Sequence, residues 1–275
     1  MGFDIKQASN TMNLVYVPTK KEKEENIKTC HICLKSKDLT YEHVPPKKAY
    51  NQYNKLWDRL QLKKNISSRT FQARGGFRVH TLCKSCNNEI CSLYAKEYIS
   101  MVKQLVEKPQ IFDKEGEAKI FSIEINRLFV AKEIATMILA TEPLSFARHN
   151  YDLRKFVLDK TYKSKPGFKV LSFLVPNSIY AGTISKTHGR VDTYAPGFKL
   201  TGGEISWFPF GIVYASEIGE GYNLSEFLDI SNWFFGNNVE SRNSIMVKLY
   251  TRLTGIESLQ SLVHSQRNRP QIDDY

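Results

Sequence analysis

The chain has 275 residues, of which 41% are hydrophobic and 24% are charged, a balance typical of a globular protein with a sizeable core. No apolar run approaches the roughly 18 residues of a membrane span, and the N-terminus lacks the apolar stretch of a signal peptide, so we expect a cytoplasmic protein with no membrane partner. The formal net charge of +11 favours a polyanionic partner.

In chain order, residues 1–27 are polar and predict a solvated lead-in with one short strand at 14–17. Residues 39–41 and 77–82 favour two strands, the second of which follows the turn signal Gly75-Gly76. From Asn87 onward, apolar residues recur at helical spacing until Pro109. Residues 28–108 are therefore predicted to run as strand, long connection, strand and helix.

The remainder, residues 109–275, is predicted to form an α+β domain rich in strands. Helical spacing of apolar residues predicts a helix over 122–141, and Asp152 is suited to cap a second helix through Leu158. Residues 197–210 are expected to form a β-hairpin that packs Trp207 and Phe208 into a core. No motif here indicates a role, so targeting and regulation are both open. Runs of β-branched and aromatic residues separated by turn residues predict strands at 168–175, 179–184, 205–208, 212–215 and 244–250.

Four of the five cysteines form two C-x2-C pairs, Cys30 with Cys33 and Cys83 with Cys86. Two short-loop pairs are what a tetrahedral Zn²⁺ with four thiolates requires. We therefore predict a structural zinc site, with the 49 residues between the pairs folded as an insertion. Disulfides would need an oxidising compartment, and the other alternative is a set of reduced core cysteines. Cys91 is expected to be a small buried core residue.

The segment from Lys47 to Lys84 is strongly basic, with ten lysine and arginine residues against a single acid, Asp58. Aromatic residues are interleaved with these charges. A solvated basic surface is the plain alternative, but such a surface usually carries acids as well, so contact with a phosphate backbone is the better explanation. The candidates for nucleic-acid binding are Lys47, Lys48, Arg74, Arg78 and Lys84.

The dipeptide Glu42-His43 lies at the end of the first predicted strand, and Asn87 directly follows the last cysteine of the second pair. Zinc would tie the two strands together, so the first turn of the helix would bring Asn87 close to the dipeptide. A carboxylate and an amide oxygen are hard ligands suited to Mg²⁺ or Mn²⁺, and an imidazole can take a proton from water near neutral pH. The alternatives are a solvated acid, a strand-end histidine and a helix cap.

The order C-x2-C, L-T-x-E-H-V-x-P-K, C-x2-C-N-N resembles the HNH endonuclease family over about residues 28–106, most closely its zinc-stabilised branch with EHxxPK and CxxCN motifs. The resemblance implies an α+β fold with an N-terminal ββα-metal finger and a zinc ion held by the four paired cysteines. By the resemblance, His43 is the general base and catalytic residue, and Glu42 and Asn87 hold one divalent ion. A further asparagine orients the base through the loop backbone, and its candidates are Asn51, Asn54 and Asn65.

The expected activity is hydrolysis of phosphodiester bonds in DNA to a 5′-phosphate and a 3′-hydroxyl, in the family's usual settings of phage defence or mobile elements. The alternative from another class is a zinc-dependent nucleic-acid-binding module without catalysis. RNA stays open as a substrate. A double-strand cut from one small active site suggests a homodimer, and a regulatory protein is a further expected partner.

Overall fold

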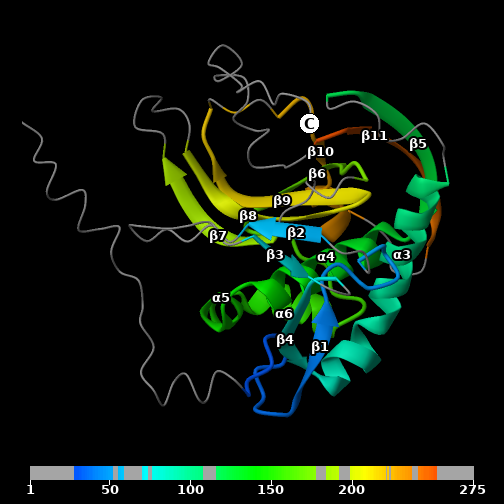
Figure 1. The fold of residues 1–275 in the computed structure, drawn as a ribbon. Helices are drawn as coiled ribbons and strands as arrows, with labels where there is room; N and C mark the ends of the chain where they lie inside the picture. Colours follow the sequence, from blue (N-terminus) through cyan, green and yellow to red (C-terminus); the bar gives the residue numbers. More distant parts are fainter. Residues whose placement is uncertain are drawn as a thin grey trace, which may run out of the picture.

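The computed structural model describes residues 28–51, 55–58, 70–73, 76–107, 116–177, 184–191, 199–220, 222, 224–236 and 241–252 (Figure 1). The predicted lead-in with its strand, most of the predicted strand at 179–184 and three of the site candidates, Asn54, Asn65 and Arg74, lie outside these residues. In the described part of the chain, no helix is long and apolar enough to cross a membrane. Helices and sheets are mixed throughout, which confirms the α+β class.

The first cysteine pair leads into an antiparallel hairpin. Its strands are β1 (Leu39–His43) and β4 (Arg78–Cys83), which pair from Leu39 opposite Cys83 to His43 opposite Arg78. A π-helical turn, η1 (Ser85–Ile90), and the helix α3 (Ser92–Val106) follow directly. The long connection between the two strands carries a separate pair, β2 (Lys55–Asp58) and β3 (Thr70–Ala73). The strand–strand–helix order predicted from the sequence is therefore confirmed.

The helix α4 (Arg127–Thr141) lies at the centre of the molecule, between the β1–β4 hairpin and a large sheet (Figure 1). The predicted helix over 122–141 is wrong at its start, because residues up to Ile125 form the strand β5 (Ala118–Ile125). Its side chains alternate, with Phe121, Ile123 and Ile125 buried, which is the period of a strand. Asn126 then caps α4 through a hydrogen bond from the Phe129 amide, 3.1 Å long.

The strand β5 pairs along its whole length with β11 (Asn243–Tyr250). The large sheet is antiparallel, with the strand order β10-β6-β9-β8-β7. Trp207 and Phe208 lie where β8 turns into β9, and both are buried, as predicted. The strands of the large sheet are β6 (Lys169–Leu174), β7 (Ile184–Val191), β8 (Lys199–Trp207), β9 (Phe210–Ile218) and β10 (Leu228–Asp229).

The short helix α6 (Tyr151–Leu158) and the 3-10 turn η2 (Ser231–Phe234) pack against α4, and a second short helix, α5 (Leu144–His149), packs against α6. The N-cap position of α6 is occupied by Asn150, and Asp152 lies in the first turn, so the predicted cap is wrong by two residues. Lys132 on α4 is fully buried, and its ammonium donates to the carbonyls of Asp159 and Tyr162, each at 2.9 Å.

One hydrophobic cluster joins the cysteine hairpin to the rest of the fold. It includes Cys30 and Leu82 beside the hairpin, Tyr94 on α3, Ile134 on α4 and Leu249 on β11. The predicted boundary at residue 108 falls outside the described residues, and the division into domains stays a prediction. What the cluster does establish is that the hairpin packs on the same core as the C-terminal strands.

Candidate functional site

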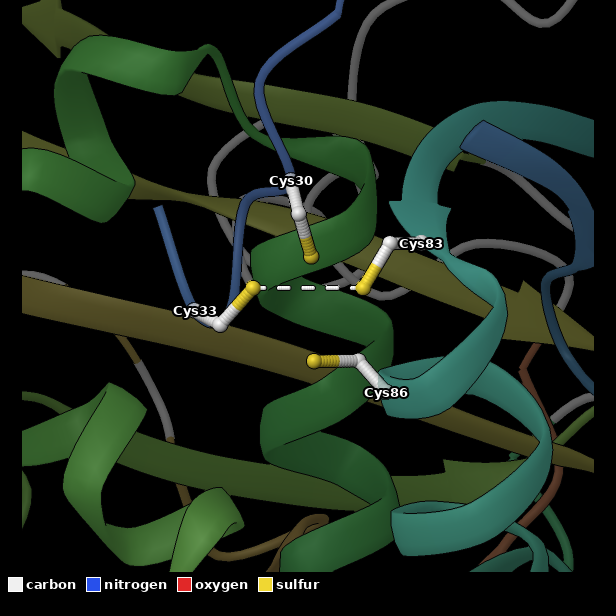
Figure 2. A group of neighbouring side chains, drawn as sticks. All are labelled: Cys30, Cys33, Cys83 and Cys86. Atoms are coloured by element: carbon white, nitrogen blue, oxygen red, sulfur yellow. Dashed lines mark hydrogen bonds between the residues drawn. The ribbon is translucent and has the colours of Figure 1, made fainter. Parts of the chain in front are cut away.

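Figure 2 shows the four paired cysteines converging on one point beside α4. Their sulfur atoms all lie within 4.8 Å of one another, and the Cys33 and Cys83 sulfurs are 3.9 Å apart. A tetrahedral zinc–thiolate centre with bonds of about 2.3 Å places its sulfurs about 3.8 Å apart. The four residues Cys30, Cys33, Cys83 and Cys86 therefore fit a zinc ion without rearrangement of the backbone.

Backbone interactions set the shape of the loop that carries the first cysteine pair. The Leu34 amide donates to the Cys30 carbonyl at 2.9 Å, and Leu34 has a φ of 56°, so the chain folds back over the two sulfurs. The second pair spans the end of β4 and the start of η1, so it reaches the same point from the other side. The two pairs meet because β1 and β4 are adjacent strands of one hairpin.

The thiols of this group shift one another's pKa values in opposite directions. A hydrogen bond from Cys86 lowers the pKa of the Cys30 thiol to about 4, and the same contact raises the pKa of Cys86. A thiolate stabilised in this way is the form that binds a metal ion. Cys91 lies apart from the group, where it is buried and accepts a weak hydrogen bond from the Thr136 hydroxyl at 3.6 Å. It is a core residue, as predicted.

Two residues close to the cysteines, His31 and Thr81, hydrogen bond to α4. The Nδ1 atom of His31, which lies between the first two cysteines, is 3.0 Å from the Leu139 carbonyl oxygen. The Thr81 hydroxyl donates to the Ala140 carbonyl at 2.9 Å. These carbonyls belong to the last turns of α4, where backbone oxygens have no partner within the helix. The contacts satisfy them and fix the hairpin against the core.

The structure brings Glu42 and Asn87 together. The Asn87 side-chain nitrogen donates to the Thr40 hydroxyl at 3.0 Å and to the Tyr41 carbonyl at 3.3 Å, the two residues that precede Glu42 on β1. Burial raises the pKa of the Glu42 carboxyl to about 7, and the hydrogen bond from Asn87 opposes that shift. His43 follows at the end of β1, half-buried and opposite Arg78 in the register.

Of the three candidate loop asparagines, Asn51 lies in the described part of the chain and clamps the loop that follows His43. Its side-chain nitrogen donates to the carbonyls of Pro45 at 2.6 Å and Phe77 at 3.0 Å, and its side-chain oxygen accepts from the Phe77 amide at 2.8 Å. The residue is fully buried. Gly76, with a φ of +89°, leaves room for it, since a Cβ there would lie 2.0 Å from the Asn51 carbonyl oxygen.

The C-terminal sheet reaches the same loop, a contact that sequence reasoning missed. The Trp207 indole nitrogen donates to the Tyr50 carbonyl at 3.1 Å, and the rings of Tyr50 and Phe208 meet edge to face with centroids 5.4 Å apart. No sequence signal links residues 157 positions apart. The end of β8 and the turn that follows it thereby contact the loop next to Asn51.

The predicted nucleic-acid contacts that the structure describes are all exposed, namely Lys47, Lys48, Arg78 and Lys84. Arg78 lies over the ring of Tyr41, with 5.2 Å between the guanidinium carbon and the ring centroid. His80 contacts the same ring, with centroids 4.8 Å apart. These groups surround the end of β1, which carries Glu42 and His43.

Comparison of the chain with known protein families, with curated proteins and with solved structures finds no match in any of the three. The chemistry of the site therefore has to be argued from its own residues.

Proposed function

We propose that this chain is a metal-dependent endonuclease of the HNH type, which hydrolyses phosphodiester bonds in DNA. The observation that carries the proposal is that Asn87, at the start of the helix, hydrogen bonds to Thr40 and Tyr41 and so lies beside Glu42 on β1. Glu42 and Asn87 are 45 positions apart in the sequence. Their meeting beside His43, at a hairpin closed by four cysteines, is the arrangement that the sequence resemblance requires.

The donor set suits a hard divalent ion. Glu42 offers a carboxylate and Asn87 an amide oxygen, the ligand types that Mg²⁺ and Mn²⁺ prefer. Burial of Glu42 penalises its charged form, which is what a carboxylate without a counter-cation experiences. A bound ion would supply electrostatic stabilisation for the phosphate and for the leaving oxygen. Glu42 and Asn87 would hold that ion at the end of β1.

His43 is the group that takes the proton from the attacking water. An imidazole titrates near neutral pH, so a neutral ring is available as a general base under physiological conditions. Its backbone is held on one side by pairing with Arg78 and on the other by the loop that Asn51 clamps onto Phe77. A base fixed in this way loses little freedom when substrate arrives.

The zinc site has a structural role in this proposal. Four thiolates complete a tetrahedral shell and leave no open position for substrate, whereas catalytic zinc sites keep one position open. Cys30 and Cys33 precede β1, while Cys83 and Cys86 join β4 to the helix. The ion would thus hold together β1, which carries Glu42 and His43, and η1, which carries Asn87.

DNA is the proposed partner because the exposed basic side chains Lys47, Lys48, Arg78 and Lys84 suit a phosphate backbone, and RNA stays open as a substrate. The hydrogen bond from Trp207 and the ring contact of Phe208 with the loop support a role for the C-terminal part in holding the catalytic loop. Activity in phage defence or in a mobile element, action as a homodimer and control by a regulatory protein remain proposals that follow from the family resemblance alone.

The test is plasmid nicking by purified protein with Mg²⁺ or Mn²⁺, compared with His43→Ala and with zinc content measured in both. The control is His149→Ala, because His149 is exposed on α5 and its Nδ1 atom lies 2.7 Å from the Ser145 carbonyl oxygen of the same helix. We expect the wild type and His149→Ala to nick, and His43→Ala to keep its zinc without nicking. Equal nicking by all three proteins would remove His43 as the general base, and DNA binding without nicking by the wild type would favour the binding module.

A further inference from the structure

We propose that Tyr41 is a stacking platform for an unpaired nucleobase of the strand that is cut. The inference rests on the proposed function and extends it, because it assigns a single-stranded or locally opened nucleic acid as the ligand of this face. The platform consists of the Tyr41 ring with Arg78 and His80 beside it.

Tyr41 is a large aromatic residue turned toward solvent at the edge of the candidate site. Its exposed fraction is 65%, too large for a ring that is covered on both faces. It immediately precedes Glu42 and His43 in the chain. Large apolar groups at the surface of a folded protein are common one by one, but one placed beside candidate catalytic residues can contact whatever those residues act on.

A β-bulge builds the platform. Thr40 pairs with Leu82 and Glu42 with Val79, so two residues of β4, His80 and Thr81, stand opposite Tyr41 alone. Bulges of this kind re-aim side chains beside functional sites. Here the bulge brings the His80 ring to 4.8 Å from the Tyr41 ring at an interplanar angle of 46°.

Arg78 places a positive charge at the same ring, with its guanidinium carbon 5.2 Å from the ring centroid. A phosphate that follows a stacked base along the strand would meet this charge. Aromatic stacking combined with a basic groove is the usual way in which proteins hold unpaired strands, and it is tolerant of sequence because every base has a flat face.

The ring is also anchored to the candidate site. The Tyr41 carbonyl accepts a hydrogen bond from Asn87 at 3.3 Å, so the backbone that carries the ring is bonded to a proposed metal ligand. A tyrosine side chain has two rotatable angles, so little freedom is lost when a base stacks on it. The platform therefore fixes a nucleotide at a set distance from Glu42 and His43.

Charge identifies the ligand as nucleic acid. The segment from Lys47 to Lys84 carries ten basic residues and one acid, and its described members Lys47, Lys48, Arg78 and Lys84 are exposed. A base must be free of its partner strand to present its face to Tyr41. The proposal therefore commits to an unpaired base, and a fully paired duplex is the alternative that the test separates.

The experiment measures the Kd of a labelled single strand and of the matching duplex, with the His43→Ala full chain so that nothing is cut. Adding Tyr41→Ala is expected to weaken single-strand binding about tenfold or more, and Tyr41→Phe is expected to preserve it. The control is Tyr151→Ala, because Tyr151 is 62% exposed and has Arg154 at 5.6 Å from its ring, yet lies on α6. It should leave the Kd unchanged.

An abasic scan locates the base. Strands that lack one base at a time should lose affinity at one position with Tyr41 present, and that loss should disappear in Tyr41→Ala. The platform is overturned if Tyr41→Ala binds as tightly as its parent, if Tyr151→Ala loses as much, or if no abasic position responds. Nicking by wild-type protein is scored separately. Tyr41-dependent binding without nicking would overturn the proposed nuclease activity and support the platform. Nicking without Tyr41-dependent binding would support the nuclease and overturn the platform.

Discussion

The indole of Trp207 donates a hydrogen bond to the carbonyl of Tyr50, which joins the C-terminal sheet to the loop that follows His43. The bond is 3.1 Å long, and Trp207 is almost completely buried. Because Tyr50 precedes the clamp residue Asn51, the contact supports the loop at its centre. The sheet and the candidate site are thus parts of one packed structure.

We expect Trp207→Phe to lower nicking activity several-fold while zinc content stays unchanged. Phenylalanine keeps most of the buried ring but cannot donate to Tyr50, so stability should fall by about 1–2 kcal/mol. Urea unfolding and nicking rates measure the two effects. The control is Trp233→Phe, since Trp233 is also buried but lies on η2. Full activity in Trp207→Phe would show that the loop does not need this support.

Asn51→Ala should be more damaging, because it leaves the Pro45 carbonyl and both backbone groups of Phe77 without their buried partner. We expect a loss of about 2–4 kcal/mol in the free energy of unfolding, and nicking that stays low at temperatures where the variant is folded. Asn126→Ala is the comparison, since it removes a helix cap on α4 at a cost of about 1 kcal/mol. Unimpaired nicking by folded Asn51→Ala would contradict a role in orienting His43.

An interaction could be predicted from the sequence when its residues are close together in the chain, and not when they are far apart. The group of four cysteines could be predicted because each C-x2-C pair is local and has the spacing that a tetrahedral metal site requires. The burial of Trp207 followed from its aromatic strand. The bond from Trp207 to Tyr50 did not, because it forms only when the large sheet packs on the loop. The choice of Asn51 among three asparagines likewise depends on the fold of a long connection.

The start of α4 shows a different limit. The apolar residues just before Asn126 also fit the helical spacing of α4. The sequence therefore predicts a helix that begins at residue 122. The chain instead forms β5, because β11 supplies a partner strand more than a hundred residues later. Local periodicity carries no information about that pairing, so tertiary structure decided between two interpretations of the same apolar residues.

Removal of zinc should unfold the hairpin and the helix that follows it. We expect a strong chelator, or Cys86→Ser, to lower the free energy of unfolding by several kcal/mol and to abolish nicking, because the metal closes the junction of β1, β4 and η1. Zinc content measured by mass spectrometry should fall with stability. Cys91→Ala is the matched control, since Cys91 is buried outside the metal group and the variant should keep its zinc. A folded, active chelated protein would overturn the structural role.

We expect ionisation of the Glu133 carboxyl to lower the free energy of unfolding as the pH rises. This fully buried carboxyl on α4 has its pKa raised well above the ordinary value by burial first and by the negative charge of Glu42 second. Within the described residues, its Oε2 atom has no hydrogen-bond partner. A carboxyl that keeps its proton in the folded state contributes stability that is fully present below its unfolded pKa of about 4.3 and is lost as the pH rises toward the folded pKa.

Glu133→Gln replaces this carboxyl by a neutral group of the same shape, so the variant should be more stable than the wild type. The difference in unfolding free energy should grow by about 1 kcal/mol for each pH unit between pH 5 and the folded pKa. Urea unfolding at pH 5 and pH 8, without added divalent ions, measures it. Glu220→Gln, which changes an exposed carboxyl, serves as the control. A difference that does not change with pH would mean that Glu133 titrates alike in the folded and unfolded chains.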